Sequence, residues 1–393
     1  MKKAVLLFCV CSYTSLFSQI WLQKAAMPSS RGLDAPISFT INGKMYVGGG
    51  YNATNVLDSF YEYDPSANTW TQKANIPQVI FSAGSFALHG KGYIVCGARG
   101  SGPYSTAVYQ YDPATDTWAT KNNFPGSGRQ NVLGFSCLGK GYLAGGFNGV
   151  VIAEMWEYND TTDSWTQKAN IPGPGRNGPA WLVVNNQIFV GMGANSNGTA
   201  IYSDFYRFDP AANTYTIVDS SPVARSSPAN YTIGNIGYVG LGYGLSGNLN
   251  DFYKYDPVAN TWTQTGHFGG TARFGAYNEV VNGVPYIGCG VINGGSYAID
   301  NWSFDHPASV TDIPSNEPLR CYPSPSAKAF TIDMSAFGAG KKGIIICDQL
   351  GQIVYQTSSS EKNLMVNQAL SEGIYIVSVS DGLQRQTAKM VIE

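Results

Sequence analysis

The chain has 393 residues, a formal net charge of −2 and only 13% charged residues. A nearly neutral chain lacks the basic surface that binds nucleic acid, and no segment approaches the 18 apolar residues of a membrane-spanning helix. The 46 glycines and 13% aromatic residues favour short strands and turns. We therefore expect an all-β protein with no nucleic-acid partner and no transmembrane segment.

The N-terminus has the pattern of a secretory signal peptide. Lys2 and Lys3 precede an apolar run at residues 4–10, and a more polar stretch leads to a cleavage site after Ser18. Residues 1–18 are therefore predicted to be removed. The cysteines that remain are not closely spaced, so neither a disulfide framework nor a zinc site is expected. They are Cys96, Cys137, Cys289, Cys321 and Cys347.

Residues 61–77 carry the signals of a β-hairpin. Tyr61 and Tyr63 face one side of a strand, Asp64-Pro65 begins a turn, and residues 69–71 restart an extended run around Trp70. Copies of this hairpin begin at Tyr109, Trp156, Tyr206 and Tyr253, and a truncated copy occupies residues 302–305. One aromatic residue on the second strand of each complete hairpin recurs at intervals of 47 to 50 residues. These residues are Trp70, Trp118, Trp165, Tyr215 and Trp262. Such a period indicates a repeat architecture.

Each repeat also has a front half, made of an apolar strand, a short turn and a second strand that ends in glycine. Asn-Gly turns at Asn42 and Asn282 are strong hairpin signals. Each repeat is therefore predicted to be four antiparallel strands. The second strands begin at Tyr46, Tyr93, Tyr142, Phe189, Tyr238 and Tyr286.

This pattern resembles the Kelch repeat. The shared features are the Gly-Gly pair after the second strand, as at Gly49-Gly50 and Gly145-Gly146, and the later Tyr-Asp-Pro and Trp. The resemblance covers roughly residues 20–305 and implies a β-propeller, in which each repeat forms one blade.

The two ends of the repeat region predict six blades. The sixth repeat stops at Asp305 before its fourth strand, and an orphan fourth strand lies at residues 20–27. Trp21 lies 49 residues before Trp70, in step with the series. We expect the N-terminal strand to complete the last blade of a propeller that spans residues 19–306.

Residues 307–319 lack the repeat and carry prolines, so they are predicted to be a linker. Short strand signals over residues 320–393 predict a small β-sandwich. This tail resembles the C-terminal (type A) sorting domain of type IX secretion substrates, through residues 322–325, 348–351, 373–375 and 389–392. The resemblance implies export across the outer membrane by the type IX machinery to the cell surface or the medium, with the tail usually cleaved afterwards.

Two series of charged residues recur together in repeats three to six. Repeat two has Ile80 and Ala107 at these positions, and repeat one has Arg31 and Asp58 slightly displaced. Because the first and third strands of a meander start at the same end, each arginine can reach the acid of its repeat. The resemblance to Kelch propellers implies another role, a rim of arginines that binds acidic ligands at the channel mouth, and both interpretations stay open. The arginines are Arg129, Arg176, Arg225 and Arg273, and the acids are Glu154, Asp204, Asp251 and Asp300.

The loops between second and third strands are rich in Tyr, Asn, Ser and Gly, a composition found in binding loops and equally in turns. His89, His267 and His306 share no repeat position, so we expect no metal site and no cofactor. The favoured function is a non-catalytic module for a protein or glycan ligand on the loop face. The alternative is a carbohydrate-active enzyme of the Kelch type, similar to a sialic-acid epimerase.

Overall fold

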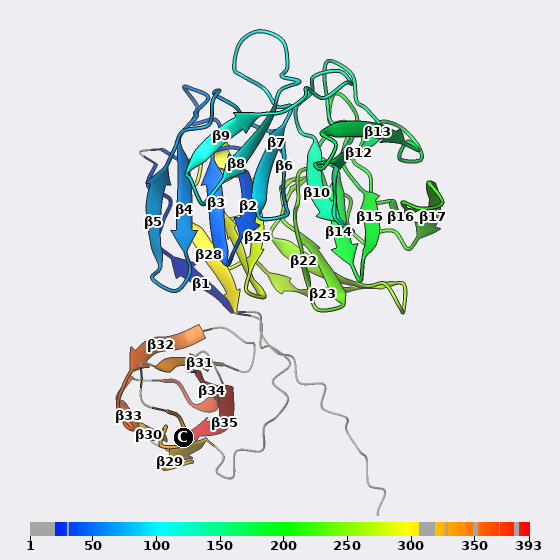
Figure 1. Ribbon diagram of the computed structural model, residues 1–393. Coiled ribbons are helices and arrows are strands. Elements are labelled where there is room, and N and C mark those ends of the chain that lie inside the picture. The colour runs from blue at the N-terminus through cyan, green and yellow to red at the C-terminus, as the bar shows by residue number, and fades with distance from the viewer. Residues whose placement is uncertain are drawn as a thin grey trace, which may run out of the picture. The chain divides into compact units, whose positions relative to one another are not determined.

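The computed structural model describes residues 20–29, 31–305, 319–326, 329–338, 340, 342–348, 353–368, 370–380 and 385–393. These residues form two compact units, one ending at Asp305 and the other containing the described residues from Leu319 onward (Figure 1). The predicted signal peptide and all of the predicted linker except Leu319 lie outside the described residues, as do the last three residues of the 348–351 motif.

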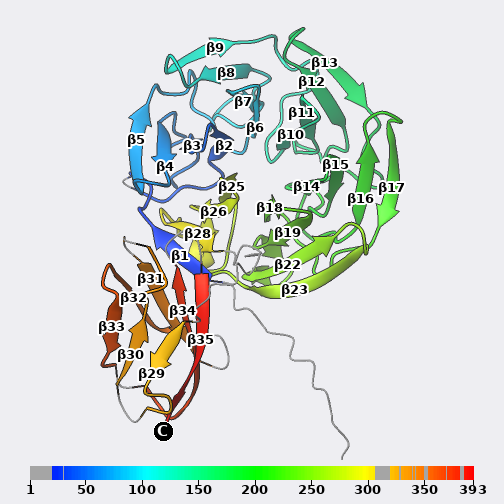
Figure 2. The ribbon, with the colours of Figure 1, turned by 60° about the horizontal axis from the view of Figure 1, so that its bottom comes forward.

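The first unit is a ring of six four-stranded antiparallel sheets, which are the blades of a propeller (Figure 2). The predicted six-bladed propeller is thereby confirmed. The innermost strands of blades one to six are β2 (Ile37–Ile41), β6 (Gly84–Leu88), β10 (Leu133–Cys137), β14 (Ala180–Val184), β18 (Ala229–Ile233) and β25 (Tyr277–Val281). The second strands are β3 (Lys44–Gly48), β7 (Lys91–Val95), β11 (Lys140–Ala144), β15 (Gln187–Gly191), β19 (Ile236–Gly240) and β26 (Val284–Gly288).

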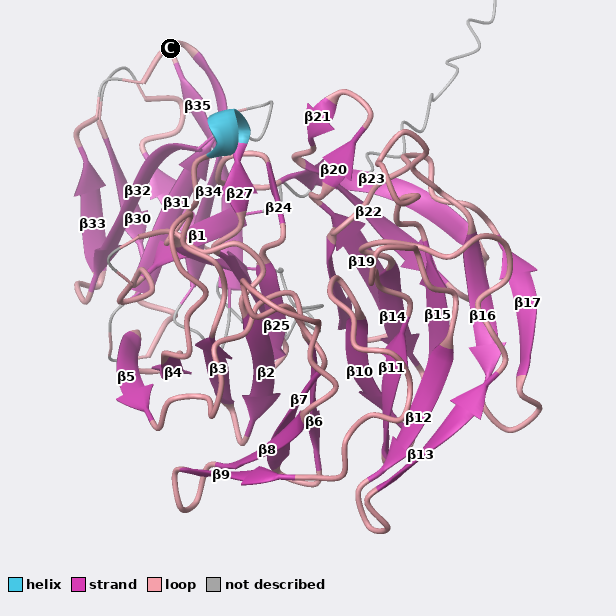
Figure 3. Cartoon of the chain, turned by 90° about the horizontal axis from the view of Figure 1, so that it is seen from above, coloured by secondary structure: helices cyan, strands magenta, loops and turns pink. Residues whose placement is uncertain are grey.

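The outer half of each blade is the hairpin found in the sequence. The third strands are β4 (Phe60–Asp64), β8 (Val108–Asp112), β12 (Met155–Asn159), β16 (Phe205–Asp209), β22 (Asp251–Asp256) and β28 (Asn301–Asp305). The outer strands are β5 (Thr69–Lys73), β9 (Thr117–Thr120), β13 (Ser164–Lys168), β17 (Thr214–Val218), β23 (Thr261–His267) and, for blade six, β1 (Ile20–Lys24). The loops add four short strands and one 3₁₀ turn to the described chain (Figure 3). These are β20 (Tyr243–Gly244), β21 (Gly247–Asn248), β24 (Arg273–Phe274), β27 (Val291–Ile292) and η1 (Asn293–Gly295).

The N-terminal strand closes the ring. β1 pairs antiparallel with β28, so that Ile20 lies opposite Asp305 and Lys24 opposite Asn301. Trp21 is buried, and its ring lies 4.8–5.6 Å from those of Phe252, Phe268 and Phe304. The last blade is thus completed without a covalent link between its third and fourth strands.

The hairpin turn of one blade also holds the preceding blade. Asn68 has a φ of 55°, a conformation that Asn tolerates better than most residues. Its side-chain oxygen accepts a hydrogen bond from the Tyr63 hydroxyl (2.7 Å) and another from the Ala25 backbone N–H (2.9 Å), just after β1. Trp70 Nε1 then donates to the Ala25 carbonyl at 2.8 Å. Four more turns repeat the contact with the preceding blade at 2.8–3.1 Å, through Asp116, Asp163, Asn213 and Asn260.

A ring of backbone hydrogen bonds joins the six segments that enter the innermost strands. One residue per blade has a φ between 44° and 63°, and its N–H donates to the carbonyl of the equivalent residue in the preceding blade at 2.7–3.3 Å. The first blade donates to the sixth, so the ring is continuous. It fixes the ends of the innermost strands on the side of the propeller where the loops gather. Its members are Ala35, Ser82, Asn131, Gly178, Ser227 and Gly275.

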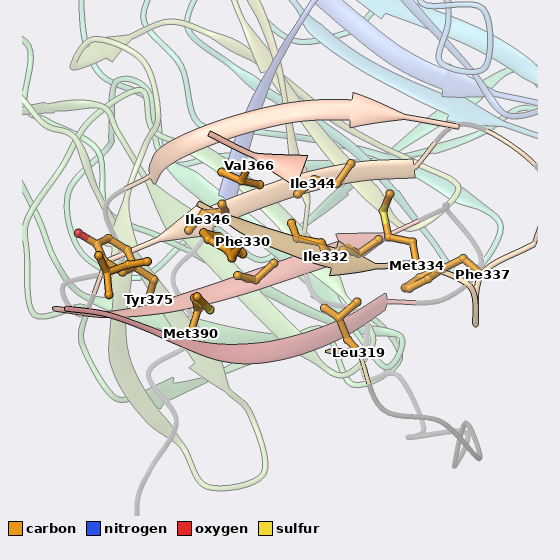
Figure 4. Packing of buried hydrophobic residues seen from close by; sticks show 13 residues of the cluster. Leu319, Phe330, Ile332, Met334, Phe337, Ile344, Ile346, Val366, Tyr375 and Met390 are labelled. Atoms are coloured by element: carbon orange, nitrogen blue, oxygen red, sulfur yellow. The ribbon is translucent and has the colours of Figure 1, made fainter. Parts of the chain in front are cut away.

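The second unit consists of a three-stranded sheet, in the order β29-β30-β33, and a four-stranded sheet, in the order β32-β31-β34-β35. Alternating apolar residues such as Ile332, Ile344 and Val377 are fully buried and fill one core (Figure 4). The predicted β-sandwich is thereby confirmed. The strands are β29 (Arg320–Tyr322), β30 (Phe330–Asp333), β31 (Lys342–Cys347), β32 (Ile353–Ser359), β33 (Asn363–Val366), β34 (Gly373–Ser380) and β35 (Arg385–Ile392).

Candidate functional site

We define the loop face as the segments that enter the innermost strands together with the loops that join second to third strands. The four recurring arginines lie on these entry segments, and their side chains are 0–1% exposed. Each guanidinium contacts the acid of its own repeat. The N–O distances are 2.6 Å for Arg129–Glu154, 2.6 Å for Arg176–Asp204, 3.1 Å for Arg225–Asp251 and 2.5 Å for Arg273–Asp300.

Arg176 shows how the pair is built. Its two terminal nitrogens donate to both oxygens of Asp204 at 2.6 and 2.7 Å, and they also donate to the carbonyls of Met192 (3.0 Å) and Pro172 (2.9 Å). The guanidinium carbon lies 5.3 Å from the ring centre of Tyr202. Burial alone would raise the pKa of the Asp204 carboxyl, but the hydrogen bonds and charge of Arg176 outweigh burial and hold this pKa below its usual range.

Arg225 is held less completely than Arg176. Its Nη1 contacts Asp251 and the Leu241 carbonyl. Among the described residues, the buried Nε lacks a partner in both arginines, but only Arg225 also has a buried Nη2 without one. Burial lowers the pKa of this guanidinium below its usual value. The four pairs are therefore similar in position but unequal in strength.

Backbone contacts identify the equivalent positions in repeats one and two. The carbonyl of the residue at the arginine position accepts a hydrogen bond from a glycine N–H of the preceding blade, as Arg129 accepts from Gly97. By this contact the position is filled by Leu33 in repeat one and by Ile80 in repeat two, which accept from Gly290 and Gly50.

The acid position is also recognised by a backbone contact. Its carbonyl accepts a hydrogen bond from the residue that follows the second strand of the same blade. Ser59 occupies this position in repeat one and Ala107 in repeat two. Arg31 and Asp58 are thus neighbours of the series, not members, and the exposed Arg31 donates to Thr54 Oγ1 at 2.7 Å.

This geometry bears on the two roles considered for the arginines. Their burial and their contacts with Glu154, Asp204, Asp251 and Asp300 support the structural role, because an arginine rim needs guanidinium groups that reach a ligand. Ligand binding by these four arginines stays a prediction.

A hollow of about 600 Å³ lies on the loop face where blades two and three meet. Sequence reasoning identified the loop that supplies part of it but not the individual side chains, because loop residues follow no repeat period. The side chains that line it include Phe81, Arg99, Tyr104, Gln130 and Asn148.

A second feature that sequence reasoning missed lies on the innermost strand of blade six. Glu279 occupies the position filled by Phe39, Phe86, Phe135, Leu182 and Tyr231 in blades one to five, as the strand registers show. Its carboxyl accepts hydrogen bonds from Ser38 Oγ (2.8 Å) and Thr40 Oγ1 (2.9 Å) on the innermost strand of blade one. Burial raises the pKa of Glu279 from 4.5 to about 7. Glu279 lies seven positions before Tyr286, the aromatic residue of its second strand, and its counterparts in the other five repeats have the same spacing. This spacing could have identified Glu279 from the sequence.

The comparisons with known proteins agree with this architecture. A family model described as the KLHDC2/KLHL20/DRC7 Kelch-repeats domain matches residues 7–190, and one described as the secretion system C-terminal sorting domain matches residues 320–393. The chain is a Kelch-repeat propeller with a C-terminal secretion-system sorting domain.

Two individual proteins add to this assignment. The human Kelch-like protein 35 is 34% identical over 62 residues, which is 16% of this chain and only 11% of that protein. The structure of YjhT aligns with a TM-score of 0.63 over 71% of this chain and 95% of its own. At 16% identity, the likeness to YjhT concerns the fold alone.

Other candidate chemistry in the Kelch propeller is sparse. His89 contacts Asp160 at 2.7 Å in an exposed turn, and His306 lies outside the described residues. Within the described part of the chain, no three His, Cys, Asp or Glu side chains gather in a way that would hold a metal ion. A search of the same residues for a helix of membrane-spanning length and hydropathy finds none.

Proposed function

We propose that the chain is a secreted, non-catalytic binding module whose loop face takes a protein or glycan ligand. The observation that carries the proposal is a contrast between two sets of side chains on that face, one paired internally and the other open to solvent. The recurring arginines and carboxylates are bonded to one another, while the hollow between blades two and three offers aromatic and polar side chains to solvent. Ligand pockets are typically lined by aromatic and apolar side chains together with a few polar groups that orient the ligand.

The alternative, a carbohydrate-active enzyme similar to a sialic-acid epimerase, would need arginine and carboxylate side chains that converge on a substrate. The four arginines of the predicted rim are each paired within their own repeat. This pairing favours the binding module over the enzyme.

The test of the binding proposal uses the mature chain on a glycan array and in a pull-down from cell-surface extracts. We expect a retained ligand, and we expect Tyr104→Ala in the hollow to abolish retention. The control is Val258→Ala, which removes an exposed apolar side chain from a hairpin turn outside the hollow. Chemical conversion of a retained glycan would favour the enzyme, and no retention by either method would contradict the binding module.

We further propose that residues 1–18 direct the chain out of the cytoplasm, and that residues 320–393 then direct it across the outer membrane by way of the type IX machinery. The match of the sorting-domain model to these C-terminal residues supports the second step. A chain truncated after Ser315 should stay in the periplasm of a host with this system, and the tail fused to an inert secreted reporter should carry that reporter outside. A truncated chain on the cell surface would contradict the proposal.

A further inference from the structure

The hollow between blades two and three is built from four separate segments. Phe81 enters from the segment before β6, and Arg99 and Tyr104 come from the loop between β7 and β8. Gln130 lies on the segment before β10, and Asn148 on the loop between β11 and β12. Its volume of about 600 Å³ is within the range of roughly 300–1,000 Å³ found for small-molecule sites.

A close backbone approach fixes one wall of the hollow. A Cβ atom at Gly128 would lie 2.2 Å from the Tyr104 carbonyl oxygen, which no real side chain can do. Glycine therefore allows the loop of blade two to lie directly against the entry segment of blade three. Tyr104 and Gln130 are positioned by this contact between the two blades.

Arg99 gives the hollow its charge. Its Nε and Nη2 donate to the Pro103 carbonyl at 3.3 and 3.0 Å, which orients the guanidinium while leaving Nη1 without an acceptor among the described residues. No Asp or Glu is among the described residues that line the hollow. Arg99 thus differs from the four buried arginines, each of which has its own carboxylate. A half-buried guanidinium with a free donor is suited to bind an anionic group such as a carboxylate.

The other side chains suit a sugar ring. The ring centre of Tyr51 lies 5.7 Å from that of Phe81 and 6.1 Å from that of Tyr297. A row of three aromatic rings therefore leads from blade six to the hollow. Aromatic rings pack against the C–H faces of sugars, and the side-chain amide of Gln130, which has no partner among the described residues, can bond hydroxyl groups.

We propose that this hollow binds a saccharide that carries a carboxylate, with Arg99 contacting the carboxylate and Phe81 and Tyr104 packing against the sugar rings. The inference rests on the proposed binding function and specifies its ligand class and its location.

The test is calorimetric titration of the mature chain with oligosaccharides of galacturonate, glucuronate and sialic acid, each compared with its neutral methyl ester. At least one acid should bind about tenfold or more tightly than its ester, the difference expected for one charged hydrogen bond. Arg99→Ala should remove this difference without changing the melting temperature. Arg31→Ala is the matched control, because it removes the same charge from the same face outside the hollow.

The outcomes separate this inference from the function on which it rests. If acids and esters bind equally, and Arg99→Ala changes nothing, glycan binding stands and the preference for a carboxylate falls. An equal loss in Arg99→Ala and Arg31→Ala would show a general charge effect and would overturn the site. If no saccharide binds in either form, the inference is overturned, while the proposed function still rests on a protein ligand from the pull-down.

Discussion

In blades three to six a buried arginine occupies the segment that enters the innermost strand, whereas in blade two Ile80 occupies that place. Asp204 and its counterparts meet the arginine, and Ala107 stands at the same position in blade two. Ile80 is fully buried among apolar residues that include Ile76 and Phe39. The blade has the same four-stranded sheet in both cases. The ion pair is thus one way to fill this space, and an apolar pair is another, as expected if the desolvation of buried charges offsets much of their attraction.

The largest effect should come from breaking one pair without replacing it. Arg176→Ile leaves the Asp204 carboxylate partly buried without its cation, and we expect a loss of about 3–5 kcal/mol in the free energy of unfolding. The double variant Arg176→Ile, Asp204→Ala reproduces the apolar pair of blade two and should recover much of that loss. Chemical denaturation of the three proteins measures both effects.

Arg207→Ile is the control for this experiment, because Arg207 is exposed on the third strand of the same blade. Its effect should stay within about 0.5 kcal/mol. If the double variant is no more stable than Arg176→Ile, an apolar pair can replace the ion pair only in the surroundings that blade two provides.

A second departure from the repeat pattern, Glu279, should make stability depend on pH. Because burial raises its pKa to about 7, the native protein binds this proton more tightly than the unfolded chain, where the pKa is near 4.5. The contribution to stability is therefore greatest below pH 4.5 and is lost as the pH rises through about 7. The loss amounts to at most about 3 kcal/mol. The difference in unfolding free energy between the wild type and Glu279→Gln, followed from pH 4 to pH 8, measures this contribution.

Thr40→Val sharpens the same test. The hydroxyls of Ser38 and Thr40 lower the pKa of Glu279 by bonding its carboxyl, so removing one should shift the loss of stability to higher pH. Burial also raises the pKa of Asp34 to about 7, so part of the wild-type pH dependence should remain in Glu279→Gln. A pH profile that is the same in Glu279→Gln and in the wild type would contradict the assignment.

The regular parts of the fold were predictable because they follow short-range chemistry. Alternating apolar residues and the interval between Trp70 and its counterparts locate the strands of every blade, and Asn-Gly turns add to this signal in blades one and six. The missing fourth strand after Asp305 indicated six blades. The reach of Asn68 into the preceding blade was not predictable, because nothing local indicates which backbone group its side chain meets. The hollow around Arg99 depends on how two irregular loops lie against each other, which the repeat period does not determine.

The four ion pairs should also differ among themselves. Arg225→Ile removes one charged contact of 3.1 Å, whereas Arg176→Ile removes two shorter ones, so we expect a loss of about 1.5–3 kcal/mol for Arg225→Ile. A double-mutant cycle of Arg225→Ala and Asp251→Ala should give a coupling of about 0.5–3 kcal/mol. Additive effects together with lost ligand binding would instead support the arginine rim.

The smallest effect should come from grafting the ion pair into blade two. Cys96 N–H donates to the Ala107 carbonyl, as Met192 N–H donates to that of Asp204, so Ala107→Asp places a carboxylate where the other blades have one. Ile80→Arg alone buries a guanidinium without a carboxylate partner and should destabilise the propeller. A double-mutant cycle of Ile80→Arg and Ala107→Asp should give a favourable coupling of about 1 kcal/mol between the two side chains. The expected value is modest because the cluster that surrounds Ile80 is apolar. A coupling near zero, measured by denaturation of the single and double variants, would show that the arginine needs the specific carbonyls and rings of blades three to six. A coupling as large as that of Arg176 and Asp204 would show that any blade of this propeller accepts the pair.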